Sequence, residues 1–342
     1  MLQVKIGEIE KVSNTSFDRQ LRDKVVEDFD GNSGEELASA YHQTKSMLEQ
    51  QIYPQIQRSE PDLSDHGTEH ISNVQENAID LLSHDGRVSN LSGIEMYCLG
   101  MFILFHDTGI VYGREGHHKN VGRVFDKIRG TAASLLREKT LVVRATGAHT
   151  GKALDGSYDT LKELDENDHL KRRRVRLREL AAVLRFADEL AEGPQRTSEF
   201  MQDEGLYARE SRQYHDNANI THIRIERATN RIVIDYEIKI ETGLPSEVRR
   251  SGLVDLLGIV YKRIQKLNQE RQYARFYSEL LAPFRFTEVK FNFHCDGEIL
   301  DTDLLPLKLT DIVVPGDQAK EIPSINPAYA INELADDILA RC

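Results

Sequence analysis

Apolar positions recur at helical spacing through the first half of the chain. They fall three and four residues apart over residues 35–53 and 65–84, a spacing that predicts amphipathic helices. Residues 93–107 are apolar on nearly all sides, which predicts a helix buried at the centre of a bundle. We expect further helices over residues 117–136, 140–149 and 170–190.

The pattern changes after residue 205. Residues 220–225 and 231–240 are rich in β-branched side chains that largely alternate with polar ones, and their short connection predicts a hairpin. A long helix is expected over residues 249–281, where Pro283 stops it. Two more strands (287–293 and 307–314) and a short helix (332–340) complete the expected elements. The chain is therefore predicted to be mainly α, a helical bundle followed by a smaller α+β part.

Composition narrows the classes of function. The chain has 342 residues, 39% of them hydrophobic, which suffices for one large domain or two modest ones. The formal net charge is -12. Such a charge disfavours a general binder of nucleic acid or of anionic membranes, although a local basic groove stays compatible with it.

Three features bear on location. No apolar stretch approaches the roughly 20 residues of a membrane span, and residues 1–10 mix charged with apolar residues, unlike a signal peptide. Cys98, Cys295 and Cys342 are far apart and odd in number, so no disulfide framework is expected. Together these features predict a cytoplasmic protein without membrane contact.

Histidines concentrate in one part of the chain. Seven of the 12 lie between His66 and His149, and all of these except His84 fall near an end of a predicted helix. His106 and Asp107 stand together at the tip of the apolar helix, and burial of such a pair is unfavourable unless a partner satisfies it. A divalent metal is such a partner. The absence of cysteine from the set favours manganese or iron over structural zinc.

Three segments are informative because of their order along the chain. They are His-Ile-Ser-Asn-Val at residues 70–74, Phe-Ile-Leu-Phe-His-Asp-Thr-Gly at residues 102–109, and Asp188. One His, a His-Asp dyad after an apolar helix and a distant Asp resemble the HD superfamily of metal-dependent phosphohydrolases. The resemblance covers residues 60–200, and residues 64–70 and 184–190 look closest to HD domains with a C-terminal extension.

The resemblance implies one or two divalent ions, of manganese, iron, nickel or magnesium. Asp107 would bridge two ions, because a carboxylate has two oxygens to share. His106 and Asp107 would be the catalytic pair, and His118 and His149 would complete the second ion; without these two the site would hold one ion. The implied ligands of the first ion are His70, His106, Asp107 and Asp188.

Seven further side chains are candidate contacts for a substrate. Arginine binds phosphate oxygens in a bidentate manner, and the basic run at residues 171–178 lies on or just before the helix that carries Asp188. Purely structural explanations of these residues remain open. The run is also typical of a solvated helix face, the dyad could be a helix cap, and Asp188 could pair with Arg185. The candidates are His66, His117, Lys152, Arg174, Arg178, Arg185 and Arg196.

We expect an N-terminal helical segment at residues 1–59, an HD domain at 60–205 and an α+β extension at 206–342. The predicted function is hydrolysis of phosphate esters of a nucleotide or nucleotide-derived small molecule by a metal-activated water. Two alternatives stay open: a nuclease for single strands, and a regulatory module that holds metal without turnover. The α+β extension could also dimerise, so a second copy of the chain is one candidate partner. The resemblance adds another, a chaperone-like ATPase module.

Overall fold

The computed structural model describes residues 15–60, 64–311 and 320–342. Contacts divide the chain into two compact units, Met1–Asp188 with Tyr277–Leu280, and Glu189–Phe276 with Leu281–Cys342. The first unit is almost entirely helical and the second holds a five-stranded sheet, so the predicted fold class is confirmed. The domains 1–59, 60–205 and 206–342 remain a prediction. Residues 1–10, and 312–314 of the last expected strand, lie outside the described ranges.

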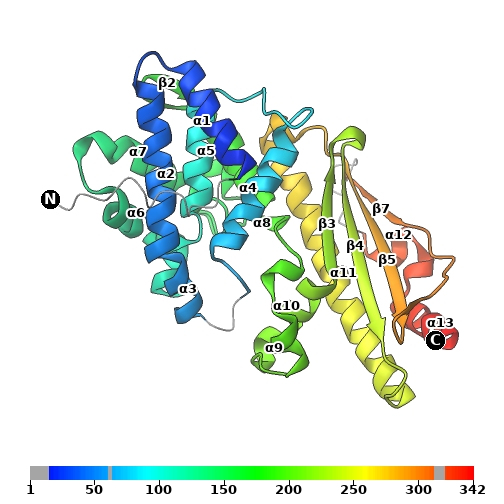
Figure 1. Cartoon of the computed structure of the whole chain (residues 1–342). Helices are drawn as coiled ribbons and strands as arrows, with labels where there is room; N and C mark the ends of the chain where they lie inside the picture. The colour runs from blue at the N-terminus through cyan, green and yellow to red at the C-terminus, as the bar shows by residue number, and fades with distance from the viewer. Residues whose placement is uncertain (1–14, 61–63, 312–319) are drawn as a thin grey trace. The chain divides into compact units, whose positions relative to one another are not determined.

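A buried helix, α5 (Gly93–Phe105), forms the centre of the first unit. All of its residues are buried. A capping box closes its first turn, in which Ser92 and Glu95 each accept a hydrogen bond from the other's backbone N–H. The helices packed around it (Figure 1) are α1 (Ser16–Asp28), α2 (Ser33–Gln51), α4 (Thr68–Leu82) and α7 (Leu136–Gly147).

Residues Gly93–Tyr112 also have the length and apolar composition of a membrane-crossing helix. The expectation that no stretch reaches this size was wrong, because the 3-10 turn η2 (Thr108–Tyr112) extends the apolar run beyond α5. However, 94% of the apolar window is buried within the fold. Such burial is typical of the core helix of a bundle.

Several other helices of the first unit have different bounds from those predicted. The helix expected over residues 117–136 is divided, because Gly130 ends it with φ of 92°. Its parts are η3 (His117–Asn120), α6 (Val121–Arg129) and η4 (Ala133–Leu135). The remaining elements are α3 (Tyr53–Ser59), η5 (Leu161–Glu163) and α8 (Leu177–Glu189).

The helix expected over residues 170–190 was wrong for its first part. Strands β1 (Asp168–Leu170) and β2 (Arg173–Val175) form an antiparallel hairpin. Lys171 and Arg172 connect them with φ values of 49° and 62°, a left-handed conformation that suits a two-residue hairpin turn and no helix. The basic run is therefore mostly a hairpin.

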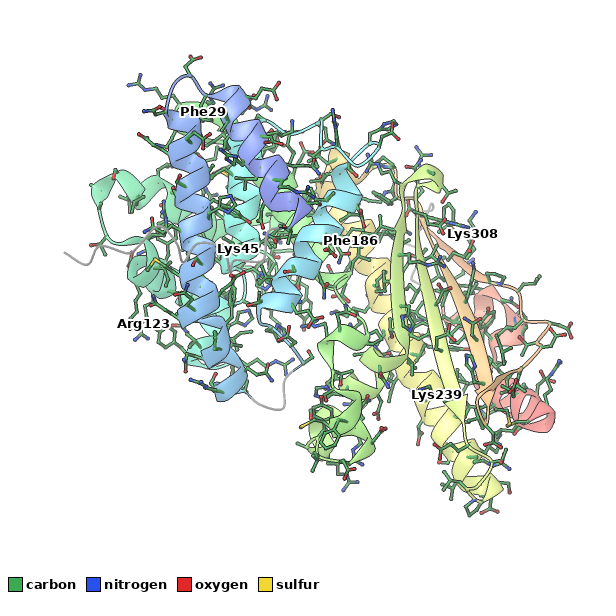
Figure 2. The ribbon with its side chains drawn as sticks, viewed as in Figure 1. Phe29, Lys45, Arg123, Phe186, Lys239 and Lys308 are labelled. Carbon is green, nitrogen blue, oxygen red and sulfur yellow. A yellow bond between two sulfur atoms is a disulfide. The ribbon has the colours of Figure 1, made fainter. Side chains whose placement is uncertain are left out.

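A buried polar network joins three helices of the first unit. Lys45 of α2 lies inside the bundle (Figure 2), where its Nζ donates to Asp18 Oδ2 at 2.7 Å and to Gln75 Oε1 at 3.3 Å. Tyr41 donates to the other oxygen of Asp18 at 2.8 Å. Because Gln75 belongs to α4, the network links α4 to α1 and α2 and fixes the positions of the three helices relative to one another.

The sheet of the second unit has the strand order β3-β4-β5-β6, and β7 also pairs with β5. The predicted hairpin is confirmed as β3 (Thr221–Glu226) and β4 (Arg231–Ile240), and β5 (Phe286–Cys295) runs parallel to β4. The long helix α11 (Ser246–Tyr277) connects β4 to β5, and its Tyr261 packs against Phe291 of β5. The short strands are β6 (Glu298–Ile299) and β7 (Leu307–Thr310).

Short helices complete the second unit. The terminal helix predicted over residues 332–340 is confirmed as α13 (Ile331–Arg341). Helices α9 (Glu199–Asp203) and α10 (Arg209–Ile220) were not predicted, because their polar sequences lack a clear apolar stripe. The others are η6 (Pro194–Arg196), η7 (Arg227–Thr229), α12 (Ile322–Ile325) and η9 (Pro327–Tyr329). The 3-10 turn η8 (Glu279–Leu281) belongs mostly to the first unit.

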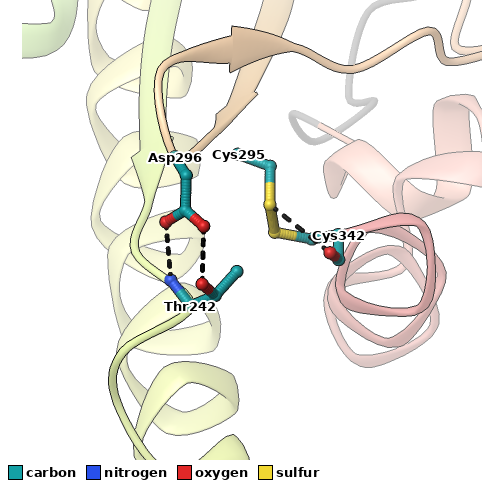
Figure 3. Close-up of a disulfide and its surroundings, with 4 residues drawn as sticks. All are labelled: Thr242, Cys295, Asp296 and Cys342. Carbon is teal, nitrogen blue, oxygen red and sulfur yellow. Dashed lines mark hydrogen bonds between the residues drawn. A yellow bond between two sulfur atoms is a disulfide. The ribbon is translucent and has the colours of Figure 1, made fainter.

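The structure corrects the expectation about cysteines. Cys295 at the end of β5 and Cys342 after α13 form a disulfide (Figure 3), with their Cα atoms 5.6 Å apart. Their sequence separation of 47 hid the pairing, because pairing depends on the fold and not on spacing. Cys98 is free and buried. The disulfide removes one of the reasons for expecting a reducing, cytoplasmic location.

Candidate metal centre

The end of α5 presents the His-Asp dyad. His106 is the C-cap residue of α5 and Asp107 directly precedes η2; both side chains are buried. His106 Nδ1 donates to the carbonyl oxygen of Ile103 at 2.8 Å, and Thr108 Oγ1 donates to that of Phe105 at 2.8 Å. Hydrogen bonds to the main chain thus fix the turn and the direction of the dyad.

Four side chains implied as ligands of the first ion converge at this turn. His70 lies in the first turn of α4 and Asp188 in the last turn of α8. His70 Nε2 is 3.2 Å from Asp188 Oδ1, and His106 Nε2 is 3.2 Å from Asp107 Oδ2. One ligand atom from each residue lies within 4.8 Å of all the others in the set His70, His106, Asp107 and Asp188.

A second group shares Asp107 with the first. Asp107 Oδ1 lies 3.2 Å from His117 Nε2 and 3.4 Å from His149 Nε2, and these three residues form a second set with ligand spacing. The other oxygen, Oδ2, faces His106 and also accepts a hydrogen bond of 2.7 Å from His66 Nδ1. The two oxygens of one carboxylate therefore serve different groups.

Three of the rings are oriented by the same device. In each, Nδ1 donates to the carbonyl oxygen three residues earlier and Nε2 faces Asp107. The carbonyl acceptor assigns the proton to Nδ1, which leaves the lone pair on Nε2 free to bind a metal. The pairs are His106 with Ile103, His117 with Arg114, and His149 with Thr146.

The charges at the site favour a cation. Burial alone would lower the pKa of His106, but the carboxylates of Asp107 and Asp188 outweigh it and raise that pKa well above its ordinary value. Burial alone would raise the pKa of Asp107, but His106 and His66 hold it well below its ordinary value. The pKa of Asp188 is lowered in the same way by His106 and His70. The site thus attracts positive charge, and metal binding would displace protons.

The residues fit divalent metal ions. His70 Nε2 and His106 Nε2 lie only 3.3 Å apart, where two lone pairs repel each other unless a proton or a cation lies between them. Imidazole and carboxylate are usual ligands of first-row divalent metals. One ion would be held by His70, His106, Asp107 and Asp188, and a second by Asp107, His117 and His149.

The predicted ligand His118 lies outside both sets with ligand spacing. The structure places His117 and not His118 against Asp107. Both lie in the 3-10 turn η3, where successive side chains point about 120° apart, so only one of the two can face the dyad. The ring of His118 instead lies over Gly151, whose added Cβ would approach it to 3.1 Å. Burial and the neighbouring His117 lower the pKa of His118.

Two arginines of the basic run were predicted to contact a substrate. Both instead donate hydrogen bonds to the loop before the hairpin. Arg174 of β2 donates to Asn167 Oδ1 at 2.6 Å. Arg178, in the first turn of α8, donates to the carbonyl oxygen of Leu164 at 2.9 Å. These contacts indicate that both side chains hold the hairpin and the loop before it. Arg196 belongs to η6 of the second unit.

Two other residues that were predicted to contact a substrate are Lys152 and Arg185. Lys152 lies on the loop after α7, with its Nζ 5.3 Å from the centre of the exposed ring of Tyr158. Arg185 of α8 donates to the carbonyl oxygen of Ala148 at 3.2 Å, next to His149 in the chain.

Two residues that support the site were missed in this role. Asp65 begins the helix predicted over residues 65–84, and its carboxylate accepts hydrogen bonds from the backbone N–H of Gly67 and of His70, both at 3.0 Å. Thr160 hydrogen-bonds the carbonyl oxygen of Ala148 at 2.6 Å. Capping residues at predicted helix starts could have indicated Asp65. No sequence pattern indicates Thr160, because it acts on main chain 12 residues away.

Comparison with known proteins agrees with this geometry. No curated protein and no solved structure matches the chain. The family model HD-CE matches residues 60–266, which is 207 of the 342 residues and includes every member of both ligand sets. An HD-type domain with a His/Asp cluster that can hold a divalent metal indicates a metal-dependent hydrolase. The match extends over more than half of the sequence, and the chain therefore belongs to the HD-CE family.

Proposed function

We propose that this protein hydrolyses phosphate esters of a nucleotide or nucleotide-derived small molecule, with two divalent metal ions at the site around Asp107. Hydrolysis breaks the bond between phosphorus and the ester oxygen. Water supplies the new oxygen on phosphorus, and its proton ends on the leaving alcohol. The net charge of -12 supports a small substrate over a long polyanion.

The position of Asp107 between two groups of histidines is the observation that carries the proposal. Its Oδ1 faces His117 and His149, and its Oδ2 faces His106. A carboxylate between two groups of imidazoles is the arrangement that holds a pair of ions close together. Bound there, such ions would supply Lewis acidity and a water of lowered pKa.

The protein's own groups would orient the site and the substrate. His66 donates to Asp107 Oδ2 at 2.7 Å, which would keep that carboxylate turned toward both groups of histidines. The Nδ1 hydrogen bonds to backbone carbonyls hold the rings of His106, His117 and His149 in place. Lys152 carries a cation three residues beyond His149, where it would contact a substrate phosphate.

The test is a screen of the purified full chain against mononucleotides, dinucleotides and oligonucleotides with manganese. Asp107→Asn keeps the size of the side chain and removes its charge. We expect it to lower kcat/KM at least 100-fold, about 2.7 kcal/mol of transition-state stabilisation. Asp85→Asn is the matched control, because the Asp85 side chain is 92% exposed.

The outcomes separate the alternatives. Equal activity of Asp107→Asn and the parent on every hit would rule out the proposed chemistry. Turnover of oligonucleotides alone, with a steep dependence on salt, would assign a nuclease. Metal bound without turnover of any phosphate ester would assign a regulatory module.

A further inference from the structure

Arg185 connects the two ligand sets through the main chain. It lies on α8, three residues before Asp188. Its Nη1 donates to the carbonyl oxygen of Ala148 at 3.2 Å and to Thr160 Oγ1 at 3.1 Å. Thr160 Oγ1 in turn donates to the same carbonyl oxygen at 2.6 Å. The three groups form a closed triangle of hydrogen bonds.

The triangle acts on the backbone of a candidate ligand. The carbonyl carbon of Ala148 is bonded to the nitrogen of His149, so holding that oxygen fixes the peptide plane from which His149 projects. The His149 ring is held separately, because its Nδ1 donates to the carbonyl oxygen of Thr146. His149 is thus fixed at both its main chain and its ring. Thr160, which completes the triangle, is buried.

We propose that Arg185 is a positioning residue that holds His149 at the second ion, and not a substrate contact. Helix α8 thereby serves both ions: Asp188 binds the first, and Arg185 sets the ligand of the second. The inference rests on the proposed metal site. A guanidinium suits this role, because its several N–H donors in a fixed plane can serve two acceptors at once.

The test measures how many manganese ions the full chain binds and the affinity of each. Manganese binding is measured by calorimetry and by the electron paramagnetic resonance of free manganese, beside the thermal midpoint. Arg185→Met should keep the first ion at parental affinity and weaken the second at least 10-fold, as loss of a residue that orients a ligand typically does. Thr160→Val should act in the same direction and Thr160→Ser, which keeps the hydroxyl, should restore parental binding.

Arg178→Met is the matched control. Arg178 lies on the same helix and also donates to a backbone carbonyl, that of Leu164, which adjoins no member of either set. It should bind both ions as the parent does. Its thermal midpoint shows what loss of such a hydrogen bond does to stability alone.

Each of the following outcomes would contradict the proposed role of Arg185. Two ions bound by Arg185→Met at parental affinities, with a raised KM for substrate, would overturn the positioning role and restore the substrate contact. Equal weakening of both ions together with a lower thermal midpoint would reduce Arg185 to a general structural role. A parent that binds one ion overturns this inference and the two-ion part of the proposed function, but leaves hydrolysis with one ion standing. A parent that binds none overturns both proposals.

Discussion

At the scale of single residues, the site depends on which atom each side chain presents. Asp107 offers one oxygen to each set, and three histidines offer Nε2 because Nδ1 is already hydrogen-bonded. Changes of one atom or one position should therefore affect one ion more than the other. Two predictions follow from neighbouring positions in the turns η2 and η3.

The first concerns the adjacent histidines. His117→Ala should weaken the second ion at least 10-fold and leave the first unchanged, because His117, unlike His118, belongs to a ligand set with Asp107. His118→Ala should leave both affinities at parental values. Manganese titration of the two variants measures this. The reverse order of effects would return His118 to the ligand set.

The second concerns Gly109, where η2 lies against η3. A Cβ added at Gly109 would lie 2.0 Å from the carbonyl oxygen of His117, so Gly109→Ala must push η3 away and move His117 from Asp107. We expect weaker binding of the second ion, at least 10-fold in a manganese titration. Gly258→Ala is the control, because its Cβ meets nothing within 4 Å. Unchanged manganese binding in Gly109→Ala would show that η3 does not place a ligand.

At the scale of elements, α5 carries the dyad and its first turn is anchored. Glu95 caps that turn through Ser92 and accepts hydrogen bonds of 2.6 and 2.9 Å from Arg176, directly before α8. Burial alone would raise the pKa of Glu95, but Arg176 and Ser92 lower it below the ordinary 4.5. The ion pair therefore links the start of α5 to the start of α8.

Glu95→Gln should destabilise the protein by about 2 kcal/mol at pH 7. The folded pKa lies below the unfolded one, so the carboxylate stabilises fully above about pH 4.5, and this contribution is lost as the pH falls through the folded pKa. The difference from the parent should shrink below pH 4. Urea unfolding at both pH values measures it, with the exposed Glu36→Gln as control. A difference independent of pH would exclude the ionic contribution.

The helices and strands also show how much of the structure could be predicted from the sequence. The uninterrupted apolar run predicted α5, and the dyad at its tip predicted the site, because a buried charged pair needs a partner. The hairpin at residues 168–175 was missed, because Lys171 and Arg172 are good helix formers that here adopt positive φ. The choice between His117 and His118 depends on the phase of a 3-10 turn, which no residue pattern encodes.

At the scale of the whole molecule, both ligand sets belong to the first unit. A ligand stabilises the structure that binds it, by about 2.7 kcal/mol at 100 times Kd. Manganese should therefore slow amide hydrogen exchange up to about 100-fold in α4, α5 and α8. Exchange in β4 and β5 should stay unchanged. Mass spectrometry of peptides, with and without a chelator, measures both. Equal protection of the sheet would mean that the two units unfold as one.

The disulfide between Cys295 and Cys342 makes the last part of the chain a covalent ring. A protease that cuts once between these residues opens the ring but releases nothing. On a gel without reductant, such a nicked protein would keep its full mass, and the C-terminal piece would separate only after thiol treatment. Migration on an unreduced gel alone is therefore no proof that the backbone of this region is whole.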